Sequence, residues 1–207
     1  MINVVFFGSS AYCIPLLQSL HDHFHLRLVI TKPDQKVGRT QELRKSAPKE
    51  FALTHNIPFI TPASLTREPD HENVIHAMLD SHPTIAIVAD YGLLIPHDIF
   101  TLPAYQTLNV HFGKLPQSRG AIPVQQTILQ GDTSAYISFF VLEQTLDTGP
   151  VVCEKKFPLV GDETTQQLYP SLFETAALQL PDVITGYIEG RYIPKTQNTS
   201  DNFQLST

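Results

Sequence analysis

The first 31 residues alternate between apolar and helix-like segments, and this order restricts the fold more than any other feature of the sequence. Residues 2–7 are a short apolar run that stops at a Gly-Ser-Ser turn, and residues 26–31 form a second run. The stretch between them carries apolar residues at helical spacing, with Pro15 near its start. Short apolar runs are typical of buried parallel strands, and proline is favoured in the first turn of a helix. The order strand, helix, strand predicts a βαβ unit and an α/β fold.

The rest of the chain continues this alternation and then changes character. In the front half we expect two helices and three strands: helices at 47–55 and 70–80, and strands at 57–61, 84–90 and 107–111. In the back half we expect two neighbouring strands and a closing helix: 135–142, 150–157 and 163 to about 180. Polar residues predict a long loop over 32–48 and a frayed tail after Pro194. The pattern predicts a Rossmann-like mixed β-sheet flanked by helices, with one domain over 1–190 and a short polar C-terminal tail over 191–207.

Composition narrows the possible partners. The chain carries a net charge of −6, so it has no global attraction to nucleic acid and would need a local basic patch for such a contact. Its two cysteines, Cys13 and Cys153, are too few for a disulfide framework and indicate reduced thiols. The N-terminus has no basic leader, and no apolar run approaches the roughly 18 residues that cross a bilayer. We therefore expect a cytoplasmic protein with no membrane partner.

Two short motifs allow both a structural and a functional interpretation. The Gly-Ser-Ser turn precedes a helix whose free amides could bind an anion, but it lacks the glycine spacing of a dinucleotide fingerprint and the lysine of a P-loop. A structural turn is favoured there, which disfavours a dinucleotide-dependent dehydrogenase. The Asp-Thr-Gly at 147–149 occurs once, on an α/β pattern, and so does not indicate an aspartic protease. For Asp147, an Asx turn and a catalytic role both stay open.

The stretch from 109 to 123 places an amide, an imidazole and a guanidinium beside glycine and proline. Asn109 and His111 are two residues apart at the end of a predicted strand, so their side chains point to the same face. In open α/β sheets, ligands bind outside the carboxyl ends of strands. Asn can donate to an oxyanion and His can transfer a proton. An acidic residue is then needed to hold the imidazole, and Asp147 in a later loop is the candidate.

Several segments together resemble one family, the folate-dependent formyltransferases. They are NVHFGKLPQSRGAIPVQQTILQGD (109–132), LDTGPVV (146–152), VADYGLLIP (88–96), TKPDQKVGR (31–39) and the opening VVFFGSSAYCIPLLQSL. The resemblance covers nearly all of the chain. The Asn-x-His element with a downstream Leu-Asp-Thr-Gly is a strong signature of the family. The Lys-Pro-Asp element favours the members that act on methionyl-tRNA over those that modify sugars.

The resemblance implies an enzyme that transfers a formyl group, with residues 1–190 as its catalytic domain. It implies 10-formyltetrahydrofolate as the donor, initiator methionyl-tRNA as the acceptor, and three catalytic residues: Asn109, His111 and Asp147. Seven residues would contact the folate, at the pterin and in the loop after the catalytic histidine: Asp90, Tyr91, Gly92, Gly113, Lys114, Leu115 and Pro116. We expect no metal, because His and Cys are not clustered at ligand spacing, and we expect a monomer.

The chain departs from the family pattern in three places. It stops soon after its closing helix, so we expect it to lack the basic C-terminal domain that helps family members hold tRNA. The loop over 32–49 has six basic and two acidic residues, a net charge of about +4, and is either a solvated loop or a phosphate contact. The candidates for tRNA contact there are Lys36, Arg39, Arg44 and Lys45. Gly113 and Lys114 replace the usual Ser-Leu, and Lys114 would contact either the glutamate tail of the folate or the acceptor.

Two other functions stay open at this level. The first is a sugar-nucleotide N-formyltransferase, although such proteins usually carry additional dimerisation or binding elements that this sequence does not show. The second is a non-catalytic folate-binding remnant. The joint presence of Asn109, His111 and Asp147 argues against the remnant, because the loss of any one of them would have disabled the enzyme.

Overall fold

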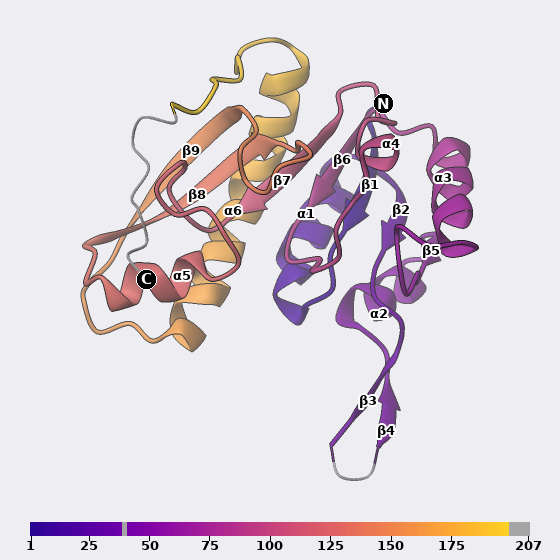
Figure 1. Cartoon of the computed structure of the whole chain (residues 1–207), viewed down its shortest axis with the longest axis horizontal. Helices are drawn as coiled ribbons and strands as arrows, with labels where there is room; N and C mark the ends of the chain where they lie inside the picture. Colours follow the sequence, from indigo (N-terminus) through magenta and orange to yellow (C-terminus); the bar gives the residue numbers. More distant parts are fainter. Residues whose placement is uncertain (39–40, 199–207) are drawn as a thin grey trace. The chain divides into compact units, whose positions relative to one another are not determined.

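The computed structural model describes residues 1–38 and 41–198 and divides into two compact units, one ending at Leu108 and the other beginning at Asn109 (Figure 1). The first unit contains four parallel strands in the order β5 (Phe59–Ile60), β2 (His25–Ile30), β1 (Asn3–Phe7) and β6 (Ile85–Val88). A single 3₁₀ turn, η1 (Ala11–Cys13), leads into helix α1 (Ile14–His23), which connects β1 to β2. The predicted βαβ unit is therefore confirmed.

Helix α1 forms where its sequence is apolar on one face only. Leu16, Leu17 and Leu20 are completely buried, while Gln18 between them is exposed. Full burial of each leucine side chain contributes about 1.5–3 kcal/mol. The other helices of this unit are α2 (Ala47–Thr54), α3 (Asp70–Ser81) and the single turn α4 (His97–Phe100). The expected helices at 47–55 and 70–80 are thus both present.

The turn after β1 has a structural role. The amide of Gly8 donates to the carbonyl of Ile30 at 3.1 Å, and the amide of Ser9 donates to the carbonyl of Asp90 at 3.2 Å. A Cβ atom on Gly8 would lie 2.8 Å from the carbonyl oxygen of Ala89, closer than such contacts allow. Both amides are therefore used to join the ends of neighbouring strands, which confirms the interpretation of this motif as a structural turn.

The segment expected to be a long loop is instead a β-hairpin for much of its length. Strand β3 (Gln35–Val37) pairs antiparallel with β4 (Glu42–Arg44), and Figure 1 shows this hairpin extending away from α2. The strands carry charged and polar residues on both faces, so the period-two apolar pattern that identifies a half-buried strand is missing. The hairpin is held by backbone pairing, and this is why the sequence pattern did not show it.

The second unit supplies the antiparallel part of the fold. Strand β7 (Thr107–His111) ends in it, β8 (Ser134–Val141) pairs antiparallel with β9 (Val151–Pro158), and the short helix α5 (Pro123–Leu129) was not predicted. The long closing helix α6 (Thr165–Ile188) begins with a capping box between Thr164 and Gln167. With parallel strands in one unit and antiparallel strands in the other, the predicted Rossmann-like mixed α/β fold is confirmed.

The chain reverses direction directly after α6. A Cβ atom on Gly186 would overlap the ring of Tyr192, whose hydroxyl donates to Asp182 Oδ2 at 2.6 Å. Further on, Lys195 and Val151 exchange two backbone hydrogen bonds of 2.8 Å each. The expectation that the chain frays after Pro194 is therefore wrong for Lys195 and for Gln197, which is only 8% exposed. Residues 199–207 of the expected tail lie outside the described residues.

Candidate active site

Strand β7 carries the predicted amide and imidazole to one place. Leu108 and Val110 are buried, and the alternation of a strand puts Asn109 and His111 on the opposite face. Asn109 is half-buried, whereas the His111 side chain is 7% exposed and its ring meets the ring of Phe140 edge to face at 6.3 Å. The strand therefore holds the imidazole in a fixed, largely dry position and leaves the amide accessible.

The hydrogen bonds of His111 determine which ring nitrogen carries a proton. Nε2 lies 2.7 Å from the carbonyl oxygen of Ser118, and because a carbonyl can only accept, Nε2 must be the donor. Nδ1 faces the carboxylate of Asp147, with Oδ2 at 3.9 Å. That separation is longer than a hydrogen bond. Nδ1 is therefore the ring nitrogen that faces the Asp147 carboxylate.

Asp147 is held by a contact distant in the chain. Its Oδ2 accepts a hydrogen bond of 2.8 Å from the amide of Gly120, and its side chain is 5% exposed. Its backbone has φ 54°, a left-handed conformation that is uncommon for residues other than glycine. Two residues further on, glycine is required at 149, because a Cβ there would overlap the carbonyl of Val141 at the end of β8. The Asp-Thr-Gly turn thus aims a carboxylate at the segment after β7, and the Asx turn is not needed to explain Asp147.

Glycine at 113 has a steric explanation. A Cβ atom there would lie 2.9 Å from Nε2 of His111 and 2.7 Å from Cβ of Pro123. The Gly113 carbonyl accepts a hydrogen bond of 2.7 Å from Ser138 Oγ on β8. Any folate contact of Gly113 would therefore be made by its backbone. The departure from the family pattern at this position leaves the space that the His111 imidazole and its neighbours occupy.

The other residues of this loop lie in different environments. Lys114 is exposed, and its Nζ lies over the ring of Tyr136, 5.1 Å from the centroid. Partial burial raises the pKa of the Glu154 carboxyl on β9, and the nearby Lys114 cation opposes that rise. Leu115 is buried, and Pro116 is half-buried. Of the four predicted folate contacts in this loop, Lys114 is the one whose side chain extends into solvent.

The three predicted folate contacts of the first unit follow β6. Asp90 is exposed and has φ 47°. Gly92 has φ 73°, and a Cβ atom on it would lie too close to Lys32 Nζ. Tyr91 is 2% exposed and packs edge to face on Phe7 at 5.5 Å. Burial raises the pKa of its hydroxyl, which has no hydrogen-bond partner among the described residues. The Tyr91 ring is therefore part of the core of its unit.

A cavity of about 920 Å³ opens at the carboxyl ends of β1, β2 and β6. Its basic lining residues are Lys32, Arg44 and Lys45, so two of the four predicted tRNA contacts lie on it. Lys36 is exposed on β3, and Arg39 lies outside the described residues. Lys49 Nζ pairs with Asp34 Oδ1 at 2.7 Å, so part of the positive charge counted in the sequence is neutralised locally.

The structure adds residues that the sequence did not single out. The carbonyl of Ser118 and the amide of Gly120 contact His111 and Asp147 directly, and Arg119 between them donates to Gln197. The Arg-Gly pair at 119–120 was part of the recognised motif, which was the available signal. Nothing in the polar residues around Gln197 predicted its burial.

Over residues 1–38 and 41–198, no cluster of three or more His, Cys, Asp or Glu side chains could hold a metal ion. In the same residues, no helix is long and apolar enough to cross a membrane.

Fold and site together define a class: an α/β protein in which a strand end and an Asp-Thr-Gly turn bring an amide, an imidazole and a carboxylate to one unit. The chain belongs to the Formyl transferase family, whose sequence model matches residues 2–184.

Among curated proteins, the chain is 33% identical over 199 residues to the methionyl-tRNA formyltransferase of Dictyoglomus thermophilum, covering 96% of this chain and 63% of that protein. It is 35% identical over 176 residues to the methionyl-tRNA formyltransferase of Janthinobacterium sp., covering 83% of this chain and 56% of the other. The chain therefore spans between about half and two thirds of the length of these relatives.

Among solved structures, glycinamide ribonucleotide transformylase 1 of Symbiobacterium toebii superimposes with a TM-score of 0.77 at 17% identity, covering 96% of this chain and 95% of that one. This likeness concerns the fold alone. It agrees with the α/β architecture that the sequence predicted, and it leaves the acceptor of the formyl group to other arguments.

Proposed function

We propose that this protein transfers a formyl group from 10-formyltetrahydrofolate to the amino group of methionyl-tRNA. The observation that carries the proposal is the position of His111, with one ring nitrogen on the Ser118 carbonyl and the other 3.9 Å from the buried Asp147 carboxylate. Membership of the Formyl transferase family and sequence relatives named methionyl-tRNA formyltransferase support it.

The proposed reaction is acyl transfer between two nitrogens. The neutral amine of the acceptor attacks the formyl carbon, the new C–N bond forms, and negative charge develops on the formyl oxygen. The bond from that carbon to N10 of the folate then breaks, and the proton lost by the amine is returned to N10. Asn109 and a protonated or proton-donating His111 would stabilise the developing oxyanion. Removing one such donor typically lowers the rate on the order of 10²–10³-fold.

Asp147 has two proposed tasks. Its carboxylate, which faces Nδ1, holds the orientation of the His111 ring. We also propose that it accepts the proton released by the attacking amine, directly or through water. The contact from the Gly120 amide keeps the carboxylate in position without neutralising it. The predicted effect of Asn109→Ala, His111→Ala or Asp147→Ala is near-complete loss of turnover with the fold retained.

Two observations favour methionyl-tRNA as the acceptor. The relatives reported above carry that activity in their names. The first unit has a cavity of about 920 Å³ bordered by Lys32, Arg44 and Lys45, and cationic side chains of this kind bind phosphates. The setting of this reaction is translation initiation, so we propose a cytoplasmic monomer. The seven folate contacts, the domain boundary at residue 190 and the remaining tRNA contacts stay predictions.

One assay tests donor and acceptor together. The purified chain is given 10-formyltetrahydrofolate with methionyl-tRNA, with an amino-sugar nucleotide or with glycinamide ribonucleotide, and formyl incorporation is measured. We expect transfer to methionyl-tRNA, abolished by His111→Ala. Transfer to the amino-sugar nucleotide alone would support the sugar-modifying alternative. Folate binding with no transfer to any acceptor would support the non-catalytic remnant and refute the proposal.

A further inference from the structure

The side chain of Gln197 is completely used in hydrogen bonds. Its Nε2 donates to the carbonyls of Asp147 at 2.9 Å and Gly149 at 2.8 Å, and its Oε1 accepts from Arg119 Nε at 3.0 Å and Nη2 at 2.6 Å. The residue is 8% exposed although the sequence around it is polar. The backbone pairing of Lys195 with Val151 fixes the segment that delivers it. A buried amide with both donors and its acceptor satisfied is a firm structural link.

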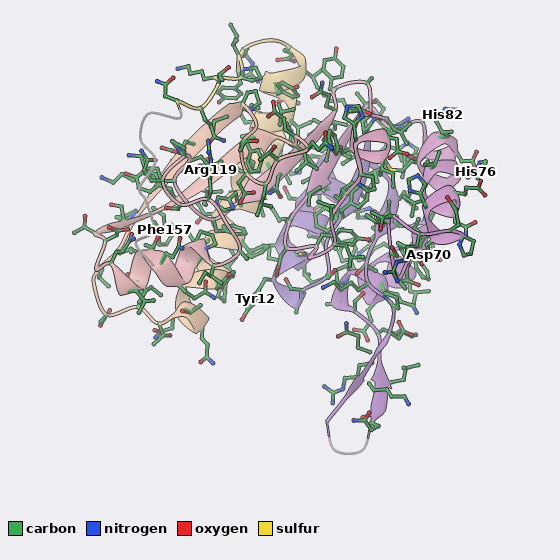
Figure 2. All side chains as sticks on the ribbon, in the orientation of Figure 1. Tyr12, Asp70, His76, His82, Arg119 and Phe157 are labelled. Atoms are coloured by element: carbon green, nitrogen blue, oxygen red, sulfur yellow. The ribbon has the colours of Figure 1, made fainter. Side chains whose placement is uncertain are left out.

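This link joins the two segments that contact the imidazole. Ser118 and Gly120, on either side of Arg119, bind His111 and Asp147 respectively. Figure 2 labels Arg119, whose guanidinium reaches Gln197. On the other side, Gln197 holds the backbone of Asp147 itself. One amide therefore connects the segment on one nitrogen of His111 to the carboxylate facing the other.

The Asp147 turn needs such support. A non-glycine residue held in the left-handed region is strained and persists only where the surroundings enforce it. The carboxylate faces His111 Nδ1 at 3.9 Å, and errors of about 1 Å in the placement of reacting groups can lower rates about 10²-fold. Without the two donors of Gln197, the carbonyls of Asp147 and Gly149 lose the partners that hold them.

We infer that Gln197 is a positioning residue for formyl transfer, acting through Asp147 on His111, and that the functional part of the chain extends beyond residue 190 to include it. This inference rests on the proposed function for its catalytic consequence and on contacts within one unit for its structural part. Gln197 itself touches no reacting atom.

The variant Gln197→Glu separates positioning from simple docking of the segment. It keeps an oxygen for Arg119 but replaces the donor to the two turn carbonyls with a second oxygen. Asn198→Asp is the matched control, since it makes the same chemical change at the exposed neighbouring residue. We expect Gln197→Glu to lower kcat about 10–100-fold with KM for both substrates within about threefold. Asn198→Asp should match the unaltered protein.

A measurement without turnover keeps this inference separate from the proposed function. The Gly120 amide donates to the Asp147 carboxylate, so its proton resonance should lie downfield and exchange slowly. We expect Gln197→Glu to lose both properties while the dispersed spectrum shows a folded chain.

An unchanged Gly120 amide, or an unchanged kcat in an active protein, would overturn the inference. Failure of the unaltered protein to transfer formyl to any acceptor would refute the proposed function alone. If Gln197→Glu does not fold, Arg119→Gln gives the same readings from the other side of the link.

Discussion

The α-carbon of Gly113 lies so close to the His111 ring that a Cβ atom there would be 2.9 Å from Nε2. The same atom would be 2.9 Å from Cβ of Ser118, whose carbonyl accepts the Nε2 proton. The space beside the imidazole is therefore already filled. The ring can occupy its position only because residue 113 has no side chain.

Gly113→Ala tests this relationship. The added methyl group must displace His111, Ser118 or Pro123, and overpacking of this kind typically costs about 1–3 kcal/mol of stability. We expect a lower denaturation midpoint and a loss of at least about 10-fold in kcat, because the imidazole leaves its position. Gln117→Ala, in the exposed part of the same loop, should have neither effect. A fully active, fully stable Gly113→Ala protein would show that the loop adjusts freely.

Asp147→Asn removes the charge while keeping an oxygen for the Gly120 amide. The ring of His111 then lacks a negative partner at 3.9 Å, so we expect kcat to fall about 10²–10⁴-fold with little change in unfolding temperature. Single-turnover formyl transfer is the measurement, because it excludes product release. Asp132→Asn makes the same change at an exposed site and should leave the rate unaltered. A small effect at Asp147 would remove the carboxylate from the mechanism.

Arg44→Ala should weaken the use of tRNA through electrostatics. Arg44 borders the cavity of the first unit and is exposed on β4, so it is available to a phosphate. We expect the slope of log kcat/KM against log salt concentration, measured with methionyl-tRNA, to decrease in magnitude by about 1. Lys156→Ala, at an exposed position on β9, is the control and should keep the slope. Equal slopes for both variants would exclude this contact.

Stability should decline at alkaline pH because of Cys13. Burial raises the pKa of this thiol from 9.0 to about 12, and the thiol donates to the Ala89 carbonyl at 3.2 Å. Above pH 9 the unfolded chain loses the proton that the folded chain keeps, so the contribution is fully present below pH 9 and is lost as pH rises towards 12. Each such group gives a slope of at most about 1.36 kcal/mol per pH unit. Cys13→Ser should flatten the measured dependence of the unfolding free energy on pH between pH 9 and about 10.5, an interval within the limits of 9.0 and about 12 given above. An unchanged slope would contradict the assignment.

Much of the first unit could be predicted because its strands are short, apolar and bounded by turns. Residues 2–7 and 84–90 show this pattern, and β1 and β6 lie within them. The β3–β4 hairpin could not be predicted, because its polar strands carry no burial period. Helix α5 was missed for a related reason: PVQQTIL is short and half polar, and only tertiary packing stabilises it.

The candidate site was predictable as far as local chemistry reaches. Asn109 and His111 share a strand, so their spacing alone predicted a common face. Asp147 was the acidic residue expected to hold the imidazole, and the structure places its carboxylate 3.9 Å from His111. The contacts made by Ser118, Gly120 and Gln197 involve backbone groups or distant segments. Neither type of contact produces a periodic pattern of residue types, so the sequence could not predict them.

The reversal after α6 brings Gln197 back to the turn that carries Asp147. The ring of Tyr192 lies where a Cβ of Gly186 would be, and the amide of Tyr192 donates to the carbonyl of Gly186 at 3.0 Å. Four residues lie between Tyr192 and Gln197. A side chain at 186 would have to displace the ring of Tyr192, and this would shift the start of the segment that leads to Gln197. The missing side chain of a helical glycine thus fixes where the segment that carries Gln197 begins.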